Sequence, residues 1–322
     1  MSDRWILTGK LALTCMAAGA LFPCSPLDAR ALPGELAAKK RAIIMMPDGE
    51  WRLEEGDDRC RLRRSFTSEK GPGIVLIEQI APGQRFDLVV AGPDFARNHR
   101  GSWFYGGIRS DEEMETIDPL EYAIPGFENA LALADMGIDD YLYTPGSKSK
   151  PVKAAIDLAS AAKVERVVFQ RSTVIVSFEL GNMAEPVGAL NDCLSKLLSE
   201  WGLDAAAYDA FTPPQMPDER VYYSRLHHAL ASKPSNAGHK SLLRVRALIG
   251  ENGAVRSCLH EYSISSGGEK PDVCADIERM TFTPAKDSEG EPIASVYSRS
   301  LILSEFDPWT ADSGGQGRWG GF

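Results

Sequence analysis

The sequence predicts an α+β protein, with a β-rich N-terminal domain that carries two helices, followed by a small β-β-α-β domain. Three observations predict it. Short β-type runs separated by Gly and Pro fill residues 61–108, a spacing typical of antiparallel sheets. Two stretches between residues 149 and 201 have helical periodicity. Residues 242–303 are then predicted to form, in order, a strand, a turn, a strand, a helix and a strand. Such a unit can bury one face of a three-stranded sheet under its helix.

The N-terminal elements follow from apolar spacing and from the residues that interrupt it. The expected strands are 61–66, 74–80, 86–91, 103–108, 167–169 and 174–178. Ser149 can cap a helix through residue 159. A stronger helix is predicted over 186–201, where Pro186 suits the first turn and Gly202 the left-handed cap. Residues 119–143 are compatible with strand or helix and stay unassigned.

The C-terminal elements alternate in the same way. Residues 242–249 are an apolar run broken by Arg244 and Arg246, as in a half-buried strand. Gly253 allows a tight turn before a second strand over 255–264. A helix is expected from Pro271 to a point before Pro284, and a last strand over 293–303.

Three short motifs punctuate this C-terminal stretch in order. They are Ser-Ser-Gly after the second strand, an aromatic residue shortly before Pro-Ala, and Gly-x-Pro before the last strand. The residues are Ser265, Ser266, Gly267, Phe282, Pro284, Ala285, Gly290, Glu291 and Pro292. With these motifs the last third of the chain resembles the C-terminal domain of TonB, the periplasmic end of the energy transducer of Gram-negative bacteria.

The resemblance implies a protein that adds a partner peptide, or a segment of an outer-membrane receptor, to a sheet edge. The expected edge is the last strand, whose serines and arginine keep an unpaired strand soluble. Its partner-binding residues would be Ser295, Val296, Tyr297, Ser298, Arg299 and Ser300. Energy transducers of this family also carry an N-terminal membrane helix and a long Pro-rich spacer, and this sequence shows neither, which leaves open whether it takes part in TonB-dependent transmembrane transport.

The first 31 residues have the features of a secretory signal peptide. Arg4 and Lys10 precede a short apolar core, and a small-x-small site ends at Ala31. About 12 apolar residues are too few to span a bilayer, which takes about 20. We expect cleavage after Ala31 and a periplasmic protein. The further organisation is predicted as a lead-in over 32–48, a domain over 49–204, a Pro-rich linker over 205–219, a domain over 220–304 and a disordered Gly-rich tail over 305–322.

Cleavage would remove Cys15 and Cys24 and leave an even number of cysteines, which favours disulfides in an exported protein. Four cysteines allow three pairings. Only one of these pairings keeps each bond within a single predicted domain. In this pairing one bond joins the second C-terminal strand to the helix that should cover it, and the other joins the first N-terminal strand to the helix predicted over 186–201. The pairs are Cys258 with Cys274, and Cys60 with Cys193.

Composition and spacing argue against several functions. A formal net charge of −10 makes nucleic acid an improbable partner. The adjacent His227 and His228 point about 100° apart on a helix, and no catalytic, cofactor or metal-binding set emerges. We therefore expect a non-enzymatic binding protein. The alternatives are a secreted enzyme with an unrecognised site in the N-terminal domain, and a structural protein that forms a homodimer through its C-terminal domain.

Overall fold

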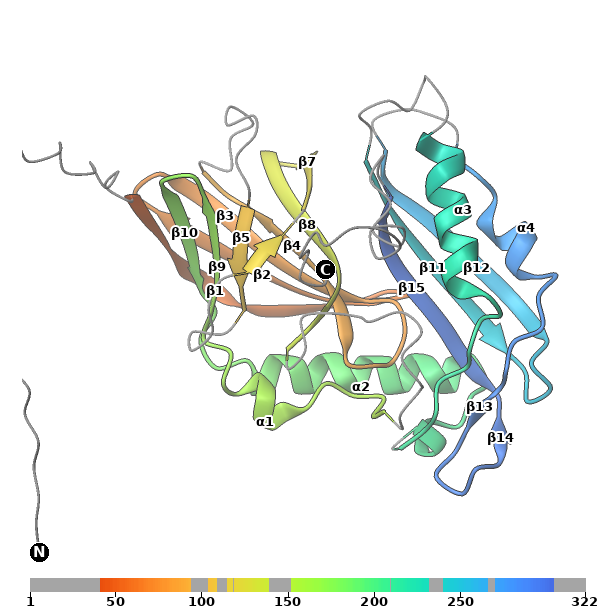
Figure 1. The fold of residues 1–322 in the computed structure, drawn as a ribbon. Helices are drawn as coiled ribbons and strands as arrows, with labels where there is room; N and C mark the ends of the chain where they lie inside the picture. Colours follow the sequence, from red (N-terminus) through yellow and green to blue (C-terminus); the bar gives the residue numbers. More distant parts are fainter. Residues whose placement is uncertain are drawn as a thin grey trace, which may run out of the picture. The chain divides into compact units, whose positions relative to one another are not determined.

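The computed structural model describes residues 41–93, 104–108, 115–117, 119–138, 152–208, 210–231, 240–265 and 270–303. The described residues belong to one compact unit. The described part is a strand-rich mixture of α and β structure (Figure 1), which confirms the predicted class at this level. The predicted signal peptide, the first part of the predicted lead-in and the predicted tail lie outside the described residues.

A large sheet dominates the N-terminal half, in the order β6-β5-β9-β10-β1-β2-β3-β4-β8-β7. Neighbouring strands in this sheet are antiparallel, except that β1 and β10 run parallel to each other. The strands are β1 (Arg41–Glu55), β2 (Cys60–Ser68), β3 (Gly71–Gln79), β4 (Arg85–Ala91), β5 (Phe104–Gly107), β6 (Glu115–Ile117), β7 (Leu120–Ile124), β8 (Phe127–Gly137), β9 (Arg166–Arg171) and β10 (Val174–Glu179).

Helix α2 (Ala184–Glu200) lies along one side of the large sheet (Figure 1). Its apolar stripe, which includes Val187, Leu190 and Leu194, joins one core with Phe66 and Phe178. Gly202 follows the helix at φ 73°, a left-handed conformation that glycine adopts without strain. The predicted helix over 186–201 is thus confirmed. The short helix α1 (Leu158–Ala161) packs beside it.

A three-stranded antiparallel sheet forms the C-terminal half, in the order β12-β11-β15. Its strands are β11 (Ser241–Ile249), β12 (Val255–Ser265) and β15 (Ser295–Leu303). Helices α3 (Glu219–Ala231) and α4 (Val273–Ile277) lie over one face (Figure 1), and both contribute to a core with Leu243 and Val245 of β11. On the other face Leu242 joins a core with Ile74 and Val89 of the large sheet. Both faces of β11 are therefore buried.

Several segments differ from the sequence-based expectations. Residues 41–48, predicted as a loose lead-in, are the first half of β1, because Ile43 and Met45 alternate into the core. The unassigned segment forms β7 and β8. The helix expected to begin at Ser149, which is outside the described residues, is reduced to α1, with Asp157 as its N-cap. In these segments burial against the large sheet determines the structure more strongly than the local propensity of the sequence does.

The C-terminal half also departs from expectation. Helix α3 was not predicted, because its polar and aromatic residues make a weak apolar stripe. The expected last strand over 293–303 is divided into β14 (Pro292–Ile293), which pairs with β13 (Ala285–Lys286), and β15. The stretch predicted as a linker contains the 3-10 helix η1 (Ala205–Tyr208), in which Tyr208 is buried, and it bridges to residues 283 and 286.

Candidate functional site

Strand β15, the predicted binding edge, pairs within the described strands with β11 alone. Its first three residues are buried: Ser295 is 0%, Val296 8% and Tyr297 3% exposed. The following residues through Ile302 are half-buried. The accessible part of the predicted edge is therefore confined to Ser298, Arg299 and Ser300, the second half of the predicted set.

Tyr297 and Arg299 point to the helix-covered face of the small sheet, where Glu219 of α3 binds both. The Tyr297 hydroxyl donates to Glu219 Oε1 at 2.7 Å, and Arg299 Nε donates to the same oxygen at 2.7 Å. The hydroxyl groups of Tyr223 and Tyr297 lie 3.0 Å apart. Burial raises the pKa of Tyr297 well above its ordinary value, so the hydroxyl remains a proton donor at neutral pH. This network fixes β15 against α3.

Ser300 points to the opposite face, where it shares an acceptor with its cross-strand neighbour Arg244. Ser300 pairs with Arg244 in the β11–β15 register. Ser300 Oγ donates to Asp87 Oδ2 at 2.9 Å, and Arg244 Nε donates to the same oxygen at 2.6 Å. Arg244 Nη2 also lies 3.1 Å from Glu78 Oε1. One guanidinium of the small sheet thus bridges two carboxylates of the large sheet.

We call this cluster of Asp87, Glu78, Arg244, Ser300 and Asp135 the seam. Glu78 and Asp87 face each other in the β3–β4 register, and both are less than 5% exposed. Two like charges directly opposite in a sheet repel, so the insertion of Arg244 between them is the electrostatic reason for the contact. Burial raises the pKa of Asp87 despite its bonds to Arg244.

Asp135 of β8 extends the seam toward β15. It has a φ of 55°, which is uncommon for a residue other than glycine, beside a register shift between β4 and β8. Its backbone nitrogen donates to Asp87 Oδ1 at 3.1 Å. Burial raises the pKa of its carboxyl, against the attraction of Arg299 and Arg85. Bulges of this kind redirect side chains, and here the bulge brings a third acid near the contact between the sheets.

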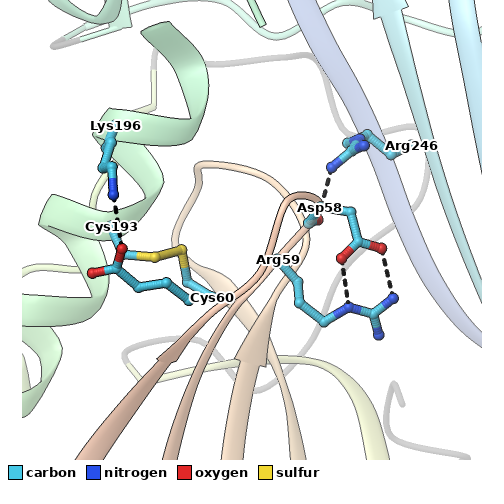
Figure 2. Close-up of a disulfide and its surroundings, with 7 residues drawn as sticks. Asp58, Arg59, Cys60, Cys193, Lys196 and Arg246 are labelled. Carbon is cyan, nitrogen blue, oxygen red and sulfur yellow. Dashed lines mark hydrogen bonds and ion pairs between the residues drawn. A yellow bond between two sulfur atoms is a disulfide. The ribbon is translucent and has the colours of Figure 1, made fainter. Parts of the chain in front are cut away.

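A second contact joins the sheets at the turn between β1 and β2 (Figure 2). Arg246 Nη1 donates to the backbone oxygen of Asp58 at 2.7 Å, and its guanidinium lies 4.0 Å from the centre of the Trp201 ring. Arg59 Nη2 lies 2.6 Å from Glu261 of β12 and 2.7 Å from Asp58. The hydrogen bond from Arg59 holds the pKa of Asp58 below its ordinary value.

The disulfides are those predicted from the sequence. Cys60 of β2 is bonded to Cys193 of α2, with Cα atoms 6.2 Å apart, directly after the turn that holds Arg246 (Figure 2). Cys258 of β12 is bonded to Cys274 of α4, with Cα atoms 5.5 Å apart. Each bond ties a strand to the helix that packs on its sheet.

The motif residues have structural roles where they are described. Phe282 is 2% exposed in the core between β11 and the helices, and Ala285 is fully buried in β13. Gly290 has a φ of 89° in the turn before β14. Ser265 ends β12, whereas Ser266 and Gly267 lie outside the described residues.

The described residues contain no group of three or more His, Cys, Asp or Glu side chains that could hold a metal ion. The helices among these residues are too short or too polar to cross a membrane. Of the adjacent histidines in α3, His227 is 1% exposed, and His228 lies about 100° further around the helix.

Sequence reasoning missed the residues that hold β15 in place. Arg244 and Arg246 interrupt an apolar run that predicts a half-buried strand, and the sequence analysis does not single out Asp87. A signal was available: Asp87 stands within the run Phe86 to Val90, and an acid there needs a cationic partner when the strand is buried. Glu219 offered no comparable signal.

A scan against models of protein families, a search of curated proteins and a search of solved structures each returned no match.

Proposed function

We propose that the protein is an exported binding protein that holds a partner polypeptide by strand addition to β15. The observation that carries the proposal is the edge position of β15 in the small sheet, where β11 is its one strand partner among the described strands and residues 298–302 are half-buried. The outer side of an edge strand presents backbone donors and acceptors. An extended segment can satisfy these backbone groups with its own donors and acceptors. The resemblance to the TonB C-terminal domain favours a periplasmic segment of an outer-membrane receptor as the partner, and transport across the outer membrane as the context.

The structure of β15 suits strand addition. Glu219 fixes the side chains of Tyr297 and Arg299, and Asp87 accepts from Ser300. The strand is therefore ordered before a partner arrives, which lowers the entropy lost on binding. Alternate side chains of the accessible segment point to opposite faces, Ser298 and Ser300 to one and Arg299 to the other. Contacts with these side chains can therefore fix the register in which a partner strand pairs with β15.

Strand β12 is the other edge of the small sheet and provides the matched control. Its Leu259 is 44% exposed. A photo-crosslinking residue at Ser298 should capture a partner segment from the cell envelope, and one at Leu259 should capture much less. Tyr297 is a poor probe position because it is buried and bonded to Glu219. Equal capture from both edges, or capture from Leu259 alone, would exclude β15 as the site. Crosslinks between two copies of this chain would favour the homodimer instead.

Proline at Ser298 tests the same edge without a probe. Proline removes a backbone donor and restricts the strand, so Ser298→Pro should reduce partner capture at least tenfold while both disulfides form normally. Ser257→Pro on β12 is the control, because Ser257 is exposed on the other edge. Val296 is unsuitable, since its side chain is 8% exposed and packs in a core. Undiminished capture by a folded Ser298→Pro protein would count against strand addition.

Export makes a separate prediction. Protein recovered from the native envelope should begin at Leu32, because cleavage is expected after Ala31. The described disulfides agree with an oxidising compartment. Mass spectrometry of the intact protein measures the N-terminus directly. A mature chain that retains Met1 would contradict cleavage.

A further inference from the structure

The two sheets pack face to face with their strands in matching order. Glu261 of β12 lies 2.6 Å from Arg59, the residue before β2. Arg244 of β11 reaches acids on β3 and β4. Ser300 of β15 donates to Asp87 of β4, and Cα atoms of β15 and β8 come within 8 Å. Because β8 and then β7 follow β4 in the large sheet, a strand added outside β15 would lie over β8 and β7.

The face of β7 and β8 that meets the small sheet is apolar and only partly covered. Ala130 of β8 is buried in the core between the sheets, and Ile302 of β15 packs against that core. Tyr122 and Ile124 of β7 and Phe127 of β8 pack against it as well, but each remains partly exposed. We call Tyr122, Ile124 and Phe127 the β7–β8 surface. The apolar contact between the sheets thus continues past β15 onto side chains that it does not fully cover.

Tyr122 connects the β7–β8 surface with the seam. The charges of Arg244 and Asp87 act on its hydroxyl, so the ring lies near the contact between the sheets. Tyr122 is opposite Ala130 in the β7–β8 register, and the small alanine side chain leaves the ring as the main apolar group at that level. A tyrosine ring offers a large apolar area with a polar tip, a combination that is common where proteins bind other chains.

Side-chain alternation along β15 determines which residue of an added strand would meet this surface. Leu242 and Ile302 are opposite each other in the β11–β15 register, and both pack on the core between the sheets. A residue of an added strand that stands opposite Ile302 points to the same side, because paired residues of neighbouring strands share a face. Its two neighbours along the strand point away from the large sheet. The position opposite Ile302 therefore faces the β7–β8 surface and favours an apolar side chain.

We propose that the β7–β8 surface is the second half of the partner site, and that it receives an apolar side chain of the strand captured by β15, at the position opposite Ile302. The proposal rests on the proposed function of β15 and names its partner class: an extended segment that alternates polar and apolar residues, with the apolar ones facing the large sheet. Backbone bonds to β15 are available to any sequence. The large sheet adds selection, because a segment with a charged residue at that position would bury it against Tyr122, Ile124 and Phe127 without a partner.

Removing one apolar side chain from the surface measures its contribution. Ile124→Ser should reduce capture by the probe at Ser298 about tenfold, the loss expected when a buried aliphatic contact is deleted. Ile124→Val keeps an apolar side chain and should retain most of the capture. Ile44→Ser is the matched control, because Ile44 is 56% exposed on β1 of the same sheet, and its capture should be unchanged. Undiminished capture by Ile124→Ser, or equal losses in Ile124→Ser and Ile44→Ser, would overturn the proposal. Urea unfolding of each variant confirms that it is folded.

Photo-crosslinking from both sheets decides the matter without a destabilising change. A benzophenone residue at Phe127 replaces one aromatic ring with another. It should capture the same envelope partner as the probe at Ser298, and mass spectrometry should place the two crosslinks within about six residues of one partner segment. A probe at Ile44 is the control and should capture none of it.

The outcomes separate this proposal from the proposed function. Capture from Ser298 with none from Phe127, or capture of unconnected segments, would overturn the second half of the site and leave strand addition to β15 standing. A crosslink from Phe127 to a second copy of this chain would make the surface a dimer contact and would also overturn the proposal. Absence of capture from Ser298 would refute the proposed function and this proposal together.

Discussion

Replacing Arg244 with leucine is expected to lower the free energy of unfolding by roughly 3 to 5 kcal/mol, the largest effect of any single substitution away from the apolar cores. Arg244 is 6% exposed and bridges Asp87 and Glu78, which are also buried. Leucine replaces the packing of the aliphatic stem but leaves Asp87 without its ion pair. The cost comes from this uncompensated acid, since a complete buried ion pair contributes little net stability.

Urea unfolding followed by circular dichroism measures the loss. Arg279→Leu is the matched control, because Arg279 pairs with Asp276 at the surface with its side chain 77% exposed, and it should cost less than about 1 kcal/mol. Arg244→Leu combined with Asp87→Leu should recover much of the loss, since the acid is removed as well. A loss below about 1 kcal/mol in Arg244→Leu would show that the seam does not hold the two sheets together.

Removing the disulfide Cys60–Cys193 is expected to cost about 5 kcal/mol, against about 3 kcal/mol for Cys258–Cys274. The difference arises from loop length: the first bond spans a sequence separation of 133 and the second one of 16. Closing a longer loop removes more conformations from the unfolded chain. The first bond also fixes the strand that follows the Asp58–Arg59 turn, so its loss should loosen the contact with Arg246.

Double alanine variants of each pair, unfolded in urea under oxidising conditions, test this order. The same variants unfolded with reductant are the control. Reductant breaks the remaining disulfide in each, so the difference between their free energies of unfolding should then vanish. Non-reducing peptide mapping of the wild type should recover the two predicted bonds. A larger loss for Cys258–Cys274, or four thiols open to alkylation in the oxidised native protein, would contradict the account.

Features that depend on local spacing could be predicted from the sequence. The stripe from Val187 to Leu198 encodes α2, and the order of β11, β12, α4 and β15 follows from alternation and turn residues. The disulfide pairing was predictable because each bond joins a strand to the helix that covers its sheet. For the helices and strands the signal is contained in one short segment of chain, where periodicity and capping residues act directly.

Features that depend on distant segments could not be predicted. The parallel pairing of β1 with β10 joins residues about 130 positions apart, and it places residues 41–45 in a strand. Asp87 and Arg244 are separated by 157 positions. Their strands look half-exposed in the sequence, and both become buried only when the two sheets meet. The edge position of β15 was predicted, but not that Ser295, Val296 and Tyr297 would be buried within it.

The most direct test of strand addition is backbone hydrogen exchange with and without the captured partner segment. We expect slower exchange of amides in residues 298–301 of β15 when the partner is bound, because new strand–strand hydrogen bonds form there, and unchanged exchange in residues 256–259 of β12. Protection confined to β12, or partner binding that leaves the amides of β15 unchanged, would contradict strand addition.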